Sequence, residues 1–185
     1  MSISTTFTSI PNLNDYINRI VLILENSALL LPQSVGGNTQ ATDLVNQIIP
    51  YKLPIPQSPI TGPGAPIIFI DVSPNPTVRF SQVGRSTIDI QGPELVVLEF
   101  YCVVVAKGKT FQDSQSQMYN ILAAVKTILK SNMRLGDPTT NPPNQSPLCN
   151  TLTAITVPFI LDTAEKTVIA RNIVIRVEKF INLRS

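Results

Sequence analysis

The chain has 185 residues, enough to bury the core of one domain, which we expect to span residues 1–185. Charged residues make up only 14% of it, against roughly 25% in an average globular chain, and its 14 basic and 12 acidic side chains form no basic block, which argues against the cationic face of a nucleic-acid-binding protein. Such sparse charge suits a subunit partly covered by copies or partners, although a monomer rich in Asn, Gln, Ser and Thr has the same composition.

The first predicted helix follows a short polar tail. Residues 1–10 lack the basic and apolar blocks of a secretory leader, and we expect them to be loose or docked on a neighbour. A proline followed by Asn12 or Asn14 is typical of a helix start, and Asp15 suits the positive end of the helix dipole. We expect this helix to end near Leu31, before the next proline. Its apolar run is too short to span a membrane.

Prolines dominate the next stretch, and half of the 16 prolines fall between positions 50 and 76. Just before it, residues 43–49 predict one or two helical turns that begin at Thr42 and end at Pro50. Residues 50–66 predict a stiff, extended arm, because proline fixes φ and lacks an N–H donor. The arm also carries apolar side chains that are unusual in a disordered linker: Tyr51, Leu53, Ile55 and Ile60. We expect it to lie on a partner's surface, with its own domain as the alternative.

A long strand stands at the centre of the predicted sheet. Short strands are expected over residues 67–72, 78–83 and 87–90, followed by one long strand over residues 95–105. One face of the long strand is entirely apolar and consists of Val96, Leu98, Phe100, Cys102, Val104 and Ala106. The other face carries Glu99, Tyr101 and Lys107 among its apolar residues, so we expect it to be partly wet.

An amphipathic helix is predicted directly after this strand, over residues 113–132. Its apolar residues recur at steps of three and four and form one stripe: Met118, Ile121, Leu122, Val125, Ile128 and Leu129. Polar residues, among them Gln117 and Lys126, lie on the opposite side. A partly wet sheet with a one-sided helix laid on it is the core of a two-layer α+β domain.

The chain ends in a predicted loop and a long hairpin. The loop over residues 134–148 has no periodicity and is long enough to be functional or mobile. The hairpin strands cover residues 152–161 and 167–183. In the first strand Ile155, Val157, Phe159 and Leu161 share one face, and in the last Ile173, Ile175 and Val177 do. The predicted class is therefore α+β, a two-layer, mostly antiparallel sheet with helices on one face, a Pro-rich extended arm and a long C-terminal hairpin.

Residues for catalysis are nearly absent from the chain. It has no histidine, the commonest general base and metal ligand, and Cys102 and Cys149 are too few for a zinc site. Carboxylates alone can hold magnesium, and Asp71, Asp89 and Glu99 lie on or near predicted strands. A carboxylate-dependent metal enzyme is therefore a remote alternative, because these residues also fit strand charges paired with Arg or Lys. We therefore expect that the protein is not an enzyme and that it binds no cofactor or metal ion.

The order of the elements resembles a known family. A leading helix and a proline-rich crossing precede the strand Glu-Phe-Tyr-Cys-Val-Val-Val at residues 99–105. A polar turn then leads to the Gln- and Asn-bearing helix over residues 111–132, and a variable loop and a hairpin ending at residues 173–177 close the chain. This layout, over residues 11–183, is similar to that of the tail terminator (tail completion) proteins of tailed phages and of related tail–neck connector subunits.

The resemblance implies a virion protein, made in the host cytoplasm, that closes into a hexameric ring. The ring would cap the completed tail tube, end its polymerisation and join the tail to the head-side neck connector. DNA would pass through its bore without sequence-specific binding, and no membrane would be involved. Head–tail stoppers and tail tube subunits are the alternatives, because the proline arm and the loop over residues 134–148 depart from the smallest terminators. We expect contact residues in the arm and the hairpin turn: Tyr51, Leu53, Ile55, Ile60, Asp162, Glu165 and Lys166.

Overall fold

The computed structural model describes residues 12–30, 33–35, 38–40, 44–50, 66–72, 81–82, 94–140, 145–157 and 167–181. Its two helices are α1 (Leu13–Glu25) and α2 (Phe111–Ser131). The strands are β1 (Gln33–Val35), β2 (Asn38–Gln40), β3 (Gln47–Pro50), β4 (Ile67–Val72), β5 (Ser81–Gln82), β6 (Glu94–Lys107), β7 (Thr151–Val157) and β8 (Val168–Ile181).

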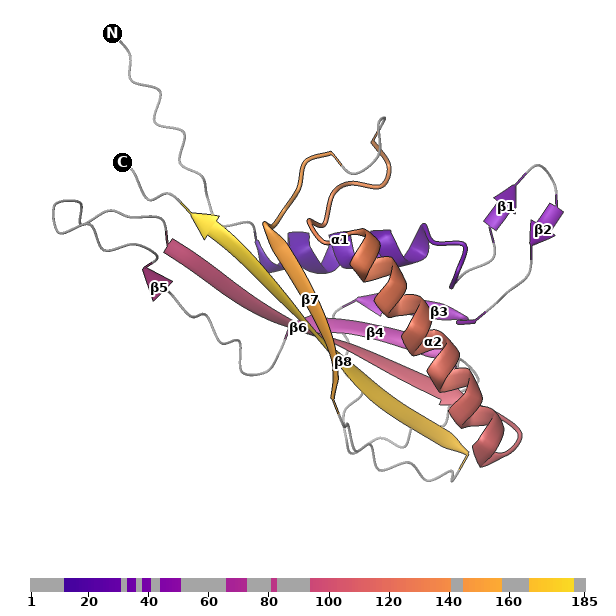
Figure 1. Cartoon of the computed structure of the whole chain (residues 1–185). Helices are drawn as coiled ribbons and strands as arrows, with labels where there is room; N and C mark the ends of the chain where they lie inside the picture. The colour runs from indigo at the N-terminus through magenta and orange to yellow at the C-terminus, as the bar shows by residue number, and fades with distance from the viewer. Residues whose placement is uncertain are drawn as a thin grey trace, which may run out of the picture.

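The main sheet has the strand order β3-β4-β6-β8-β7, and β5 pairs with the start of β6. Every neighbouring pair is antiparallel except β3 and β4, which are parallel, and β1 and β2 form a separate small hairpin. Both helices lie on the same side of the sheet (Figure 1), and their buried residues share one apolar core with one face of its strands. The predicted two-layer α+β class with a mostly antiparallel sheet is thus confirmed.

Strand β6 behaves as its alternation predicted. All six residues of its predicted apolar face are at most 5% exposed and belong to the core beneath the helices. On the opposite face Glu99, Tyr101 and Lys107 are half-buried, but Val103 and Val105 are fully buried. That face is therefore only partly exposed to solvent. The last strand is long as well: β8 has 14 residues, falls within the predicted range 167–183, and turns Ile173, Ile175 and Val177 into the core.

Helix α2 begins two residues earlier than its apolar stripe predicted. Its cap is Thr110, whose hydroxyl accepts the Asp113 N–H at 3.1 Å, while the Asp113 carboxylate accepts the Thr110 N–H at 3.0 Å. This reciprocal capping box satisfies two of the donors that a helix start leaves unpaired. The stripe is confirmed, because all six of its predicted residues are buried.

The junction of β6 and α2 is closely packed. The Ser114 hydroxyl accepts the Gly108 N–H at 2.8 Å and also contacts the carbonyl of Thr167 at the start of β8. A Cβ at Gly108 would lie 2.6 Å from Asp113 Cβ, so only glycine fits this turn. Gln117 was placed on the polar side of the helix, yet its side chain is half-buried and accepts the Lys107 N–H at 3.1 Å. Gln117 therefore holds the end of β6.

Helix α1 starts as predicted but ends early. Asn12 and Asp15 form its capping box. The helix stops at Glu25 instead of near Leu31, because the Asn26 backbone and side-chain N–H groups both donate to the Leu22 carbonyl and close the last turn. Asn and Ser side chains compete for backbone hydrogen bonds in this way and favour helix ends over helix interiors.

The expected helical turns before Pro50 are wrong, because residues 47–50 form strand β3. Strand β3 pairs in parallel with β4, and its Ile48 is buried under α1. The Val45 N–H donates to the Leu30 carbonyl at 3.2 Å and the Asn46 N–H donates to the Pro66 carbonyl at 2.7 Å, so the chain is already extended before the strand begins. Pairing with a distant strand outweighs the local start signal at Thr42.

We predict that Leu122→Ala lowers the free energy of unfolding by about 2–5 kcal/mol, because the side chain is 8% exposed and its removal leaves a cavity between α2 and the sheet. Lys126→Ala is the matched control, since Lys126 lies on the exposed side of the same helix and should cost less than about 0.5 kcal/mol. Chemical denaturation followed by circular dichroism measures both, and equal losses would contradict the packing described here.

Candidate functional site

The seven contact residues predicted from the sequence lie outside the described residues. They are Tyr51, Leu53, Ile55, Ile60, Asp162, Glu165 and Lys166. The predicted arm also lies outside the described residues, apart from its two ends at Pro50 and Pro66, and so does the whole hairpin turn. The candidate site is therefore built from the strands and helices that the structure does describe.

The three carboxylates considered for magnesium do not meet in the described part of the chain. The Asp71 carboxylate accepts the N–H of its neighbour Val72 at 2.7 Å, and Glu99 stands directly opposite Arg176 on β8. Asp89 lies outside the described residues. Among residues the structure describes, no group of three His, Cys, Asp or Glu side chains is placed to hold a metal ion.

The sheet has a second face, opposite the helices, which we call the outer face. Directly opposed residues share a face, so the outer face includes Asp71 of β4, the odd-numbered residues of β6, the even-numbered residues of β8 and the odd-numbered residues of β7. Its residues at one end form a buried apolar cluster, to which neither helix contributes: Ile67, Phe69, Val103, Val105, Val168 and Ala170.

Charged residues gather at the other end of the outer face. Arg176 lies across from Glu99 and forms an ion pair with Glu178, with 3.3 Å between Nε and Oε1. The two paired side chains are 42% and 31% exposed, so this contact adds little to folding stability. An apolar cluster beside exposed charges of both signs is the arrangement found where protein surfaces meet, with a dry centre and a polar rim.

Asn172 sits between these two regions. It is 3% exposed, lies across from Val103 on one side and Val157 on the other, and its side-chain oxygen has no hydrogen-bond partner. An unpaired buried acceptor costs roughly 1–3 kcal/mol. Sequence reasoning passed over Asn172, although an asparagine inside the apolar run of the last strand was a visible signal.

Strand β7 forms one edge of the sheet and turns an apolar residue outward. Of the residues predicted to share a face of this strand, Ile155 and Val157 are described, and they lie on the outer face, not in the core. Ile155 is 60% exposed, whereas Leu152 of the other face is buried under the helices. Alternation alone separates the two faces of a strand, but its register against β8 decides which one is buried.

The loop after α2 is fixed to α1. Leu135 is fully buried in a left-handed backbone conformation, at φ 50°. Burial raises the pKa of the Tyr16 phenol, so its hydroxyl stays protonated and donates to the Leu148 carbonyl at 3.1 Å. Arg19 pairs with Asp137 at 3.2 Å. The predicted loop over residues 134–148 is thus bound to the helix layer through its described residues.

The thiols take no part in an exposed site. Burial raises the pKa of Cys102 to about 12 and that of Cys149 to about 11. Both therefore stay protonated near neutral pH, and the predicted place of Cys102 on the apolar face of the long strand is confirmed.

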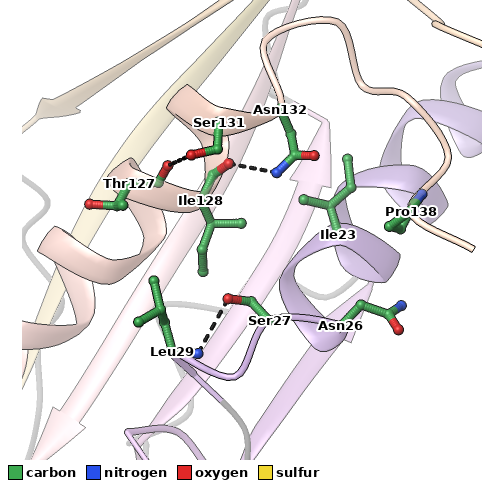
Figure 2. Close-up of a pocket in the computed structure, with 9 residues that line it drawn as sticks. All are labelled: Ile23, Asn26, Ser27, Leu29, Thr127, Ile128, Ser131, Asn132 and Pro138. Atoms are coloured by element: carbon green, nitrogen blue, oxygen red, sulfur yellow. Dashed lines mark hydrogen bonds between the residues drawn. The ribbon is translucent and has the colours of Figure 1, made fainter. Parts of the chain in front are cut away.

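A pocket of about 300 Å³ opens where the C-terminal ends of the two helices meet (Figure 2). The side chains of Asn132 and Ser131 donate to carbonyls of α2, and the Ser27 hydroxyl accepts the Leu29 N–H. These polar groups are therefore already hydrogen-bonded within helix ends and turns. All nine lining residues are neutral: Ile23, Asn26, Ser27, Leu29, Thr127, Ile128, Ser131, Asn132 and Pro138. None of them can act as a general acid or base at neutral pH, so the pocket is a surface notch.

Comparison with known proteins gives no assignment. A scan against protein-family models finds no match for this chain, and a search of curated proteins finds no significant match. In the described part of the chain, no helix has the length and apolar content needed to cross a membrane. The candidate functional site is therefore the outer face together with the exposed edge strand β7, and its geometry suits protein contact.

We predict that part of the acid sensitivity of the fold resides at Asp137. Hydrogen bonds from the Thr139 hydroxyl and N–H, together with Arg19, hold the pKa of this carboxyl below its ordinary value of 3.8. A lowered pKa means that the charged carboxylate stabilises the folded state above about pH 4 and that this contribution is lost as pH falls through the lowered pKa. The stability difference between wild type and Asp137→Asn should therefore be largest at pH 7 and shrink below pH 4.

Thr139→Val is the matched control for this site, because it removes one hydrogen bond to the carboxylate and leaves the Arg19 pair in place. It should produce a smaller difference with the same dependence on pH, measured by denaturant unfolding between pH 7 and pH 2.5. A gap between wild type and Asp137→Asn that is the same at both ends of this range would contradict the assignment.

Proposed function

We propose that this protein is a structural subunit of a phage tail, a tail terminator that forms a hexameric ring on the end of the tail tube. The order of its elements supports the proposal, because a leading helix, a long strand, a polar turn into an amphipathic helix and a closing pair of antiparallel strands are what the resemblance implies. The two-layer fold is also of the kind expected for such a small α+β subunit.

The main support for the proposal is a surface with few charges and several exposed apolar side chains. Only 14% of the residues are charged, and large apolar side chains are exposed on helix α2, just after the ends of both helices, and on strands β7 and β8. These residues are Leu29 (in the turn after α1), Phe111, Tyr119, Met133, Ile155 and Phe180, all at least 46% exposed. Exposed apolar groups spread over several sides fit a subunit with more than one neighbour, as in a ring between a tube and a connector.

A ring needs two different patches on each subunit that fit one another. The exposed face of α2, with Phe111 at 54% and Tyr119 at 67% exposure, lies on the helix layer. Ile155 and the charged residues of the outer face lie on the other side of the sheet. Two patches on opposite layers support head-to-tail contacts that close into a ring, because each patch can meet a different neighbour.

We predict that the purified protein forms hexamers, either alone or on tail tubes, visible as rings by negative-stain electron microscopy and as a sixfold mass by light scattering. Tyr119→Glu should weaken ring formation at least tenfold, because it places a charge in the apolar patch of α2. Asn120→Glu introduces the same charge at an exposed position about 100° further around the helix, so it is the matched control and should assemble. Monomers only, by scattering and cross-linking with tubes present, would refute the ring.

We also predict that the proline arm takes part in assembly. Deletion of residues 51–64 should leave a subunit with native-like circular dichroism that no longer forms rings or caps tubes, since burial of each arm hydrophobe on a partner would contribute roughly 1–3 kcal/mol. Unfolding of the deletion variant would instead show that the arm belongs to the core of its own subunit.

A further inference from the structure

The edge of β7 that faces away from β8 is unpaired within the described part of the sheet. Strand β7 is the last strand in the order, and its seven residues, Thr-Leu-Thr-Ala-Ile-Thr-Val, carry no charge and no proline. Natural proteins commonly guard such edges with charges, prolines, bulges or a covering segment, because a bare edge offers a row of N–H and C=O groups to any other strand. Among the described residues β7 has none of these protections, so we expect a segment outside the described residues to cover its edge.

The N-terminal end of α1 lies next to the beginning of β7. The Tyr16 hydroxyl, one turn into α1, donates to the carbonyl of Leu148, which precedes Thr151 by three residues. Asn150 is already paired to β8, with its N–H 2.9 Å from the Glu178 carbonyl. Figure 1 shows the start of α1 beside the start of β7. Asn12, at the start of α1, therefore lies at the end of the sheet where β7 begins.

The sequence ahead of α1 is typical of a strand. Residues 2–10 read Ser-Ile-Ser-Thr-Thr-Phe-Thr-Ser-Ile and contain no charge, no glycine and no proline. Thr, Ile and Phe favour extended backbone, and Ile3 and Phe7 fall on the same face of a strand. Nine extended residues span roughly 30 Å, more than the roughly 23 Å of a seven-residue strand such as β7.

We propose that residues 2–10 add to the free edge of β7 in the same molecule as an antiparallel strand. The direction follows from the geometry, because the segment must finish beside the start of β7 to enter α1. The same molecule is favoured over a neighbour because the short tether through Pro11 and Asn12 holds the segment at a high local concentration. The added strand satisfies the backbone groups of β7 and brings Phe7 toward the exposed Ile155. It does not depend on ring formation.

Disulfide trapping tests this pairing directly. In a background of Cys102→Ala and Cys149→Ala, Thr153→Cys or Ile155→Cys is combined in turn with Thr5→Cys, Thr6→Cys, Phe7→Cys or Thr8→Cys. Directly opposed strand residues place their Cβ atoms about 4.5–5.5 Å apart, close enough to form a disulfide with small adjustment. Under mild oxidation, at least one pair should form an intramolecular disulfide in more than half of the molecules, seen by peptide mapping of the monomer band.

Lys126→Cys on α2, combined with the same tail substitutions, is the control, and its thiol should stay reduced. If no tail position forms a disulfide with β7, or if only disulfide-linked dimers appear, the proposal is overturned. Circular dichroism must first show that the Cys102→Ala, Cys149→Ala protein is folded.

Amide hydrogen exchange, measured on the protein that keeps Cys102 and Cys149, provides a second test. The double variant Thr5→Pro, Thr6→Pro removes two donors from the added strand, and Thr5→Ala, Thr6→Ala is its control. The proline variant should raise the exchange rate of those β7 amides that do not donate to β8 at least tenfold, and the alanine variant should leave them unchanged. Equal β7 exchange in both variants would overturn the proposal.

Discussion

The antiparallel pairing of β6 with β8 is the constraint on which the rest of the structure depends. The two strands match over 14 residues, from Glu94 opposite Ile181 to Lys107 opposite Val168. Every other part of the main sheet attaches to this ladder: β4 and β5 on β6, β3 on β4, and β7 on β8. Because the register sets which residues point to which face, it also places α2, which packs on the apolar face that the two strands share. A slip of one residue would turn the apolar side chains of one strand to the opposite face of the sheet.

The ladder also explains why the two faces of the sheet differ in composition. Its helix-covered face is filled by aliphatic side chains and by Phe100, whose ring lies 5.7 Å from that of Tyr16 on α1. Its outer face passes from buried valines to the opposed charges of Glu99 and Arg176. The first face supplies the folding core, so the second is free to differ along its length. A graded outer face of this kind fits contact with other proteins better than it fits chemistry.

Much of this fold could be predicted, because its strongest signals are local. The stripe of α2 and the alternation of β6 each depend on residues close together in the sequence, and the structure has both. The cap of α2 at Thr110 is an equally local signal, but it was not predicted. The end of α1 was missed because apolar spacing continues past Asn26, whose side chain nevertheless closes the helix. Strand β3 was missed because its partner β4 is about 20 residues away. The exposure of Ile155 was missed because it depends on the register of β7 against β8, which the alternation within β7 does not reveal.

The two edges of the sheet are protected unequally within the described residues, and this asymmetry decides which edge is the better template for another strand. Strand β3 has four residues, ends at Pro50, and is preceded by Val45, whose N–H is taken by the Leu30 carbonyl. A short edge that ends in proline is a poor template for another strand. Strand β7 is longer, uncharged and partly exposed. If the subunit joins others through backbone pairing, the β7 side is the side where it can do so, and any segment that covers β7 decides when that pairing is open to a neighbour.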